Sequence, residues 1–469
     1  MAGFSVAGLT SGIEYGKLIE QLVSIEQKTA DGLKEKKTDY QSKISAYETL
    51  SSKLGTMESA SKKLSDISTF DVKKAEVTDE TILSASASYD ATTGNYIISD
   101  ITALAQAHKI TNVDAKRLAD KDTTTVLANG QTLQYTVTVD GAAEITTLTA
   151  SSDLTLEGLV SAINSTQSAA NSLITVTATI INDGNAGTPY RLVMTSNTSG
   201  SSGGITINSD ASVLDLDNSG GTGGTTTLQS AQNAAFKVDG LSISKTSNTV
   251  SDVVPGTAFT LKKAAGAGYS YTLTVKNDTD AIKTSIKAMT DAYNEVVKQI
   301  NDNSKYDTDK KKGGSLFNEG NTESIIRRLR SIYTSAISGL SDDTKVMAQV
   351  GLKTNRDGTV TMDDGKLGTK LTSDFTDTRA LFINNTSTGI EGVAKKLYDE
   401  LDDITDFAEG SITVRKKGIQ KVIDKYTKDI KTEEDRLKAY EDSLKAKFAT
   451  LEAFLTTMNT ESKFISRRV

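Results

Sequence analysis

The chain of 469 residues is too long for one ordinary hydrophobic core, and a typical domain size of about 150 residues predicts roughly three domains. Its 53 Lys and Arg residues against 60 Asp and Glu residues give a formal net charge of −7, and no run of like charge is long enough to attract phosphates, which argues against a nucleic-acid partner. The complete lack of cysteine excludes disulfides, thiolate catalysis and cysteine-ligated metals. Only two prolines occur, so little interrupts long helices.

The start of the chain does not have the pattern of a cleavable secretory signal. In residues 1–22 no basic segment is followed by an apolar run and a small-residue cleavage site. No apolar stretch approaches the roughly 18 residues that span a bilayer, so we expect a chain that is soluble unless a partner carries it. Residues 1–10 hold too little apolar surface to order themselves.

A first long helix is predicted over residues 13–67, where apolar residues return at helical spacing. Ser11 and Glu14 match a capping box, which predicts that the helix starts there. The apolar positions form a narrow stripe on a lysine-rich rod: Leu18, Leu22, Ile25, Leu33, Tyr40, Ile44, Tyr47, Leu54, Met57 and Leu64.

Residues 70–276 change to a period of two, as in 134–140 (QYTVTVD) and 271–275 (YTLTV), which predicts a β-rich middle. Asp140-Gly141 and Asp239-Gly240 each lie between alternating runs and predict type I′ hairpin turns, and Asp357-Gly358 repeats the signal later. A helix is expected over 154–163. Residues 195–227 are dominated by Ser, Gly, Thr, Asn and Asp, which predicts a loop-rich tip or a domain boundary.

Helical periodicity returns over 282–300 and 325–340, with a short β element over 351–361 between these segments and the last helix. That last helix carries an apolar stripe of roughly 70 Å in the 4,3 spacing of a coiled coil: Ile419, Ile423, Tyr426, Ile430, Leu437, Tyr440, Leu444, Phe448, Leu451, Leu455, Met458 and Ile465. Two successive spacings of four around Leu444 form a stutter. We therefore predict a change of packing geometry, or of packing partner, near Leu444.

The predicted fold is α+β and multidomain, with a long helical bundle or coiled-coil stalk built from both chain ends and β-rich head domains inserted between them. The two ends are expected to pair with each other while the β part projects from their far end. An amphipathic stripe more often faces a core within its own chain, but one this long and narrow outlasts any compact core available here. The pattern therefore favours an assembly protein.

No catalytic, metal or cofactor site is predicted. His108 is the only histidine and is assigned no role, because a metal cluster or catalytic arrangement needs further partners. Residues 307–313 resemble a calcium loop only faintly, since lysines stand where a ligand and a glycine are needed. Residues 215–226 lack the closing Glu, and glycines near 220–224 lack the Lys-Ser/Thr ending of a phosphate loop. We do not expect an enzyme.

Several stretches in order resemble the flagellar hook-associated protein 2 family, the filament-capping proteins, and together they cover nearly the whole chain. They are 8–14 (GLTSGIE) with 18–22 (LIEQL) and Glu26; 231–241 (AQNAAFKVDGL) with 247–250 (SNTV) and 255–256 (PG), continuing into 278–282 (DTDAI) and 291–295 (DAYNE); 351–352 (GL) with 357–360 (DGTV) and 381–382 (LF); and the terminal stripe from Leu444 to Met458. Residues 154–164 resemble the flagellin-hook insert of this group.

The resemblance implies a structural protein that leaves the cell through the flagellar export channel without a cleaved signal. It would form a homo-oligomeric ring at the growing filament tip, outside the cell, where it retains exported flagellin and helps it fold and insert. Implied partners are other copies of the chain, flagellin, the hook–filament junction proteins and a flagellar export chaperone, with no nucleic acid, membrane or cofactor. A surface adhesin that binds through the β head is the alternative.

The implied domain layout places flexible legs at both ends and modules of the head plate between two stalk segments: 1–40 leg, 41–70 stalk, 71–104 first part of a β head domain, 105–227 outer β head domain, 228–276 second part of the first head domain, 277–436 stalk with a short β element, and 437–469 leg. The predicted assembly interface lies on the stripes of the two legs: Leu18, Leu22, Ile25, Leu444, Phe448, Leu451, Leu455 and Met458.

Overall fold

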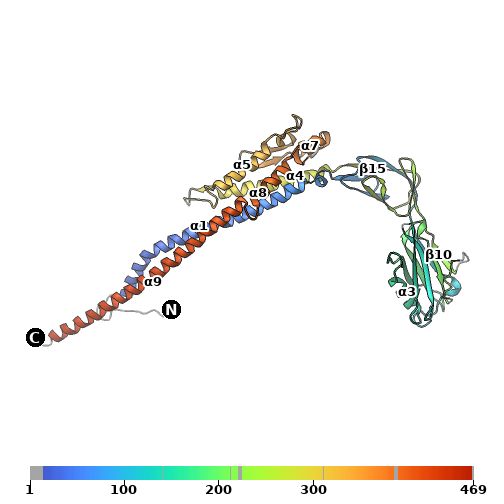
Figure 1. Ribbon diagram of the computed structural model, residues 1–469, viewed down its shortest axis with the longest axis horizontal. Helices are drawn as coiled ribbons and strands as arrows, with labels where there is room; N and C mark the ends of the chain where they lie inside the picture. The colour runs from blue at the N-terminus through green and yellow to red at the C-terminus, as the bar shows by residue number, and fades with distance from the viewer. Residues whose placement is uncertain are drawn as a thin grey trace. The chain divides into compact units, whose positions relative to one another are not determined.

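The structure is a computed structural model that describes residues 14–139, 141–211, 213–219, 224–309, 311–384 and 389–466. Its contacts divide the chain into two compact units. The first, called the helical unit, comprises Met1–Phe70 and Thr279–Val469, and the second, called the β unit, comprises Asp71–Asp278. The helix–strand–helix order predicted from the sequence is confirmed (Figure 1).

Two long helices, α1 (Tyr15–Ser65) and α9 (Ser411–Ser466), lie side by side in the helical unit (Figure 1). They run antiparallel, because Tyr40 stacks on Tyr426 at 5.7 Å between ring centroids while Tyr15 stacks on Phe448 at 5.0 Å. The expected pairing of the two chain ends is thus confirmed. Ser11 of the predicted capping box lies outside the described residues, and Glu14 precedes α1 without a side-chain capping bond.

Shorter helices and two small hairpins complete the helical unit, with α4 and α8 packed against α1. The predicted helix over 325–340 is α5 and ends earlier, at Thr334, because Ser335 turns extended and Gly339 has a φ of 89°. The elements are α2 (Ile67–Phe70), α4 (Thr279–Asn303), α5 (Gly320–Thr334), α6 (Asp364–Ser373), α7 (Phe375–Phe382), α8 (Val393–Thr405), the 3-10 helix Met347–Val350, β16 (Tyr306–Asp307) paired with β17 (Lys312–Gly313), and β18 (Leu352–Thr354) paired with β19 (Val360–Met362).

Asp357-Gly358 lies in the β18–β19 connection, but the predicted two-residue turn is wrong. Five residues join these strands, and of the pair only Gly358 has a positive φ, 89°. A longer loop lets Asp357 keep an ordinary backbone conformation while its carboxylate accepts bonds from the backbone N–H and the hydroxyl of Thr359.

The β unit has two hydrophobic cores. The first lies between a five-stranded sheet and a three-stranded sheet, where Phe236 and Phe259 meet edge to face at 5.7 Å. Asp239 (φ 49°) and Gly240 (φ 84°) make the tight β11–β12 hairpin predicted from the sequence. The sheet orders are β1 (Lys73–Val77), β15 (Gly266–Asn277), β3 (Gly94–Ala103), β11 (Ala234–Val238), β12 (Leu241–Lys245); and β13 (Thr249–Val254), β14 (Thr257–Leu261), β2 (Leu83–Ala87).

The second core lies among a four-stranded sheet, a three-stranded sheet and α3 (Leu156–Ser165). The predicted helix over 154–163 is confirmed with a shift of two residues, since the Thr155 side chain caps its start. Gly141 (φ 84°) lies in the β5–β6 hairpin, while Asp140 is outside the described residues. The sheet orders are β10 (Thr225–Gln229), β4 (Ala107–Asn112), β8 (Tyr190–Ser199), β7 (Val176–Asn182); and β6 (Ala142–Thr149), β5 (Thr132–Val139), β9 (Thr206–Ser209).

The segment predicted to be loop-rich, 195–227, also contains strands that the sequence did not predict. The end of β8, all of β9 and most of β10 fall inside it, and β9 and β10 pair with β5 and β4. These strands are rich in Thr, Ser and Asn, and most of their side chains are exposed or half-buried, so their composition is that of a loop although their backbone is in sheets.

Three asparagine side chains form hydrogen bonds with both backbone groups, the N–H and the carbonyl, of a distant residue. Asn164 binds both the N–H and the carbonyl of Ala178 on β7, at 2.8 and 2.9 Å. Asn248 does the same for Ala105, at 2.7 and 3.0 Å, and Asn294 does so for Val360 on β19, at 2.7 and 2.8 Å. We call these three residues the asparagine clamps. The side-chain amide of asparagine carries a donor and an acceptor, placed as they are in a peptide group of an adjacent strand. Each clamp therefore takes the place of a missing strand partner.

Candidate functional site: an assembly surface on the long helices

A buried carboxylate ties the long helices together. Glu319, just before α5, is only 6% exposed and accepts hydrogen bonds from Arg415 of α9 at 2.8 and 2.9 Å. The Lys43 ammonium and the Tyr47 hydroxyl, both from α1, donate to it at 2.7 and 2.8 Å. We call these four residues the Glu319 cluster. It sets how far α1 and α9 slide past each other, and so where their exposed stripes lie.

The cluster holds Glu319 ionised. Burial by itself would raise the pKa of this carboxyl, but the hydrogen bonds from Arg415, Lys43 and Tyr47 outweigh burial and lower its pKa from 4.5 to about 2. Burial and the adjacent carboxylate raise the pKa of Tyr47. Sequence reasoning missed this cluster, because a single Glu ahead of a helix has no periodic signal.

Exposed ion pairs also link α1 to α9 further along the two helices. Lys34 lies 2.7 Å from Glu434, and Arg436 lies 2.7 Å from Glu26. Each pair is about half exposed, so it contributes little stability and mainly selects the alignment of the two helices.

On α1 the predicted interface residues lie beside the residues that are buried in the contact with α9. Tyr15 and Ile19 take the buried positions, Leu22 is half-buried, and Leu18 and Ile25 are exposed, Ile25 by 60%. Leu18, Leu22 and Ile25 recur at spacings of four and three, so they form one apolar edge beside the helix pair. The stripe read from the sequence thus combined two neighbouring faces.

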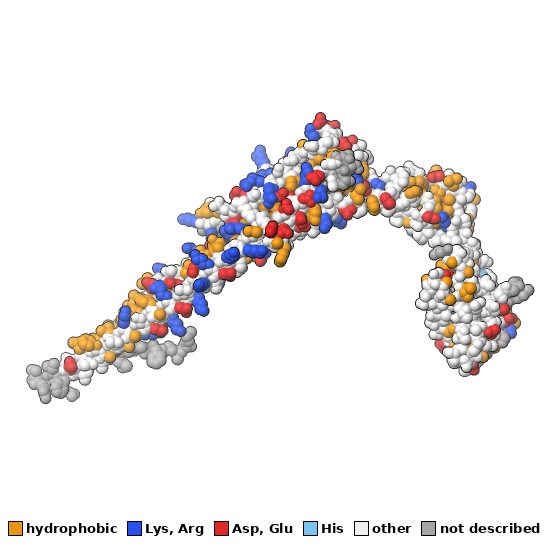
Figure 2. All heavy atoms as spheres, viewed as in Figure 1, with side chains coloured by type: hydrophobic (Ala, Val, Ile, Leu, Met, Phe, Trp, Pro, Cys, Tyr) orange, Lys and Arg blue, Asp and Glu red, His pale blue; other side chains and the backbone are white. Residues whose placement is uncertain are grey.

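On α9 the predicted residues divide near the stutter. Leu444 is buried, and Phe448 and Leu455 are half-buried. Leu451 is 42% exposed and Met458 is exposed as well. Figure 2 shows hydrophobic side chains gathered along this end of the helix.

Tyr15, the first residue of α1, stacks on Phe448, so α9 continues beyond the start of the described part of α1. Phe454, 59% exposed, widens the exposed stripe and was missed because it falls between the 4,3 positions. The changes of packing partner and of crossing geometry expected near Leu444 remain predictions.

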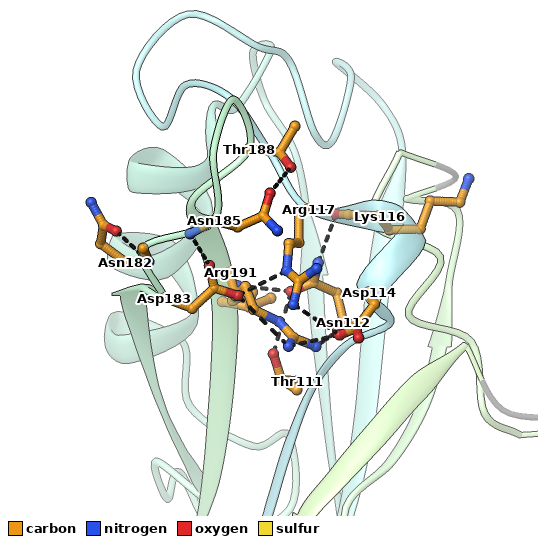
Figure 3. Close-up of polar contacts among 12 residues, drawn as sticks. Thr111, Asn112, Asp114, Lys116, Arg117, Asn182, Asp183, Asn185, Thr188 and Arg191 are labelled. Carbon is orange, nitrogen blue, oxygen red and sulfur yellow. Dashed lines mark hydrogen bonds and ion pairs between the residues drawn. The ribbon is translucent and has the colours of Figure 1, made fainter.

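The β unit contains a cluster of ion pairs near the β7–β8 hairpin (Figure 3). Arg117 donates to Asp183 at 2.8 Å, and Arg191 lies 2.9 Å from Asp114 and 3.9 Å from Asp183. Two cations and two carboxylates therefore neutralise one another and clasp the turn before Arg117 to the β7–β8 hairpin. The cluster favours a structural clasp over a ligand site, and it lends no support to the adhesin alternative.

Other chemistry is not evident in the described part of the chain. Among those residues, no group of three His, Asp or Glu side chains is placed to hold a metal. Across the same residues, no helix combines the length and apolarity that a membrane span needs. His108 accepts a hydrogen bond at Nδ1 from the backbone of Ile205 at 2.9 Å, which is a structural role.

Comparisons with known proteins identify the family. Residues 11–108 match the family described as "Flagellar hook-associated protein 2 N-terminus", and residues 231–460 match "Flagellar hook-associated protein 2 C-terminus". The B-type flagellar hook-associated protein 2 of Pseudomonas aeruginosa is 30% identical over 500 residues, covering 99% of this chain and 97% of that protein. Flagellar hook-associated protein 2 of Escherichia coli is 29% identical over 484 residues, covering 100% and 98%.

A solved structure agrees. The D1-D2-D3 domains of the flagellar cap protein FliD from Escherichia coli share 27% identity with this chain at a TM-score of 0.65, covering 80% of this chain and 99% of that one. The resemblance inferred from the sequence motifs is confirmed. This chain belongs to the flagellar hook-associated protein 2 family.

Proposed function

We propose that this chain caps the growing end of a bacterial flagellar filament as a ring of identical copies. Membership of the hook-associated protein 2 family and the similarity to a flagellar cap protein support this function. The main observation in this chain that supports the function is the exposed apolar stripe on α9 beyond Phe448. Exposed apolar stripes of this kind mark surfaces that bind a partner.

The stripe is the proposed contact with other subunits. Leu18, Leu22 and Ile25 on α1, and Leu444, Phe448, Leu451, Leu455 and Met458 on α9, form the assembly interface, with Phe454 added by the structure. Residues 1–40 and 437–469 act as legs that reach into grooves between subunits, and the β-rich segments 71–104, 105–227 and 228–276 form the plate. An amphipathic helix in an apolar groove gains about 25 cal/mol for each Å² of apolar surface removed from water.

The role is structural, without catalysis or a cofactor. The cap retains exported flagellin and promotes its folding and insertion, and it contacts the hook–filament junction proteins before the filament grows. An export chaperone delivers the chain, which leaves through the flagellar export apparatus without a cleaved signal peptide and acts outside the cell at the filament tip.

A deletion strain tests the function against the adhesin alternative. Without a cap, unpolymerised flagellin leaks into the medium and filaments are short or missing. A strain that keeps full-length filaments and loses only surface attachment would show that the chain is an adhesin.

A charge on the stripe tests the interface. Leu451→Asp should weaken ring formation, measured by light scattering, while the free energy of unfolding changes by no more than about 0.5 kcal/mol, because the side chain is largely exposed. Thr460→Asp is the matched control, since it puts the same charge at an exposed position on the opposite face of the same helix from Leu451. Unaltered rings and motility in Leu451→Asp would contradict the assigned interface.

A further inference from the structure

One strand edge of the β unit borders an open groove. β12 is the outer strand of the five-stranded sheet, and a cavity of about 520 Å³ lies between it and β13. Both apolar and polar side chains line this cavity, and Leu241 among them is 71% exposed. The lining includes Tyr96, Val238, Leu241, Ile243, Val253 and Val254.

The outer edge of β12 has free backbone groups. In the tight β11–β12 hairpin the pairs Val238–Leu241 and Phe236–Ile243 face each other through their backbone hydrogen bonds, so the backbone groups of Ser242 and Ser244 point away from β11. Among the described residues, no hydrogen bond reaches those outward groups.

Three other strand edges in the described part of the chain are covered by asparagines. Asn164 covers Ala178 on β7, and Asn294 covers Val360 on β19. On β9, the side-chain oxygen of Asn218 accepts from the backbone N–H of Ile207 at 2.6 Å, and the backbone N–H of Asn218 donates to the Ile207 carbonyl at 3.1 Å. A chain that covers these edges and leaves β12 uncovered beside a partly apolar groove has the features of a strand-addition site.

A complementary edge exists on the same chain. β10 (TTTLQ) is the outer strand of the four-stranded sheet, and Thr226, Thr227 and Leu228 are exposed (Figure 1). β10 contains no charged residue, and the one cation on β12, Lys245, is already paired with Asp252 at 2.5 Å. The two edges can therefore approach without repulsion, and Leu228 supplies an apolar side chain for the groove.

We propose that β12 of one copy pairs with β10 of a second copy of this chain, with Leu228 packed into the groove beside Leu241. This inference rests on the proposed function, because it assumes that copies assemble. Two different surfaces meet in this contact, so it is heterologous, which is the type of contact that builds a ring when the rotation between copies closes. The occupant of the groove is an extended strand, because the β12 wall is a strand edge on which the outward backbone groups of Ser242 and Ser244 need partners.

Cysteine cross-linking tests the pairing directly, since the chain has no cysteine of its own. Ser244→Cys and Thr227→Cys are made in separate full-length chains, mixed, and treated with a short bismaleimide that tolerates differences in register. The mixture should give a covalent dimer on a denaturing gel, and neither variant alone should do so. Ser244→Cys mixed with Thr149→Cys, an exposed threonine on β6, is the control.

The outcomes separate the two proposals. If rings form by light scattering but the Ser244→Cys and Thr227→Cys mixture gives no more dimer than the control, the strand pairing is wrong while the cap function stands. A homodimer of Ser244→Cys alone would show a β12–β12 contact and also overturn the pairing. If no oligomer forms under any condition, the proposed function itself fails.

A proline variant gives a second readout. Ser242→Pro removes an outward N–H on an edge strand, where proline is tolerated, and should raise the concentration needed for assembly by about tenfold. Ser242→Ala keeps the N–H and should assemble as the unaltered chain does. Equal assembly by both variants would overturn the pairing.

Discussion

The helical unit joins its long helices through a buried ionised cluster and uses one asparagine clamp, Asn294, at its small β18–β19 hairpin, whereas the β unit has two clamps, Asn164 and Asn248. In the helical unit, Glu319 joins three helices through full charges, because helices satisfy their own backbone and only side chains can link them. In the β unit, Asn164 and Asn248 bind backbone groups, because sheets leave unpaired N–H and carbonyl groups at their edges. The difference predicts that the two units respond differently to mutation and to acid.

The largest effect is expected at the Glu319 cluster. Glu319→Gln leaves Arg415 and Lys43 partly buried without their anion and should lower the free energy of unfolding of the helical unit by about 3 kcal/mol. Glu323→Gln is the control, because its contact with Arg327 at 3.7 Å is exposed, and it should change stability little. Urea titration followed by circular dichroism measures both. Equal stability of the two variants would show that the Glu319 cluster does not stabilise the helical unit.

The next effect is expected at an asparagine clamp. Asn248→Ala leaves both backbone groups of Ala105, which is buried, without partners and should cost the β unit about 2 kcal/mol. Asn185→Ala, in an exposed loop where the side chain binds Thr188, is the control and should cost less than about 0.5 kcal/mol. Amide hydrogen exchange should increase at Ala105 in the first variant only. Unchanged exchange there would mean that water replaces the clamp.

Acid should weaken the helical unit in a defined range. The pKa of Glu319 is lowered from 4.5 to about 2, so the unfolded chain takes up this proton first and stability falls as the pH drops from about 4.5 towards 2. Above pH 4.5 the contribution is fully present. Glu319→Gln should lose less stability over that range than the unaltered chain does, and identical acid profiles would contradict the ionised assignment.

The smallest effect is expected in the β unit at milder pH. Burial lowers the pKa of His108 below 6.5, and its Nδ1 accepts from Ile205, so the unfolded chain protonates first. Stability of the β unit should be complete above pH 6.5 and decline as the pH falls below that value. His108→Gln can keep an acceptor without titrating and should flatten the decline. An equal decline of stability with falling pH in His108→Gln and in the unaltered chain would show that His108 does not cause it.

The sequence predicted the elements whose periodicity is sustained. The stripe from Ile282 to Ile300 became the buried face of α4, and the stripe from Ile419 to Leu444 became the buried face of α9, because both run for several turns. The Asp239-Gly240 turn was also predicted, because its backbone requirement is local.

The parts that could not be predicted depend on distant partners. The Glu319 cluster joins residues more than two hundred positions apart, and each clamp relies on an amide whose partner is set by the tertiary fold. Strands β9 and β10 were missed because their Thr and Ser side chains carry a loop composition. That Leu18 and Ile25 lie beside the buried α1–α9 contact could not be read from the sequence, because a helix stripe does not show which neighbouring face the partner helix covers.

The mass of the particle in solution tests the central claim most directly. Light scattering across a concentration series should show a particle that grows from the 49.9 kDa single chain to a defined multiple of that mass. Leu451→Asp should shift the transition to higher concentration, while Thr460→Asp should not. A particle that stays at the mass of one chain at every concentration would contradict the account.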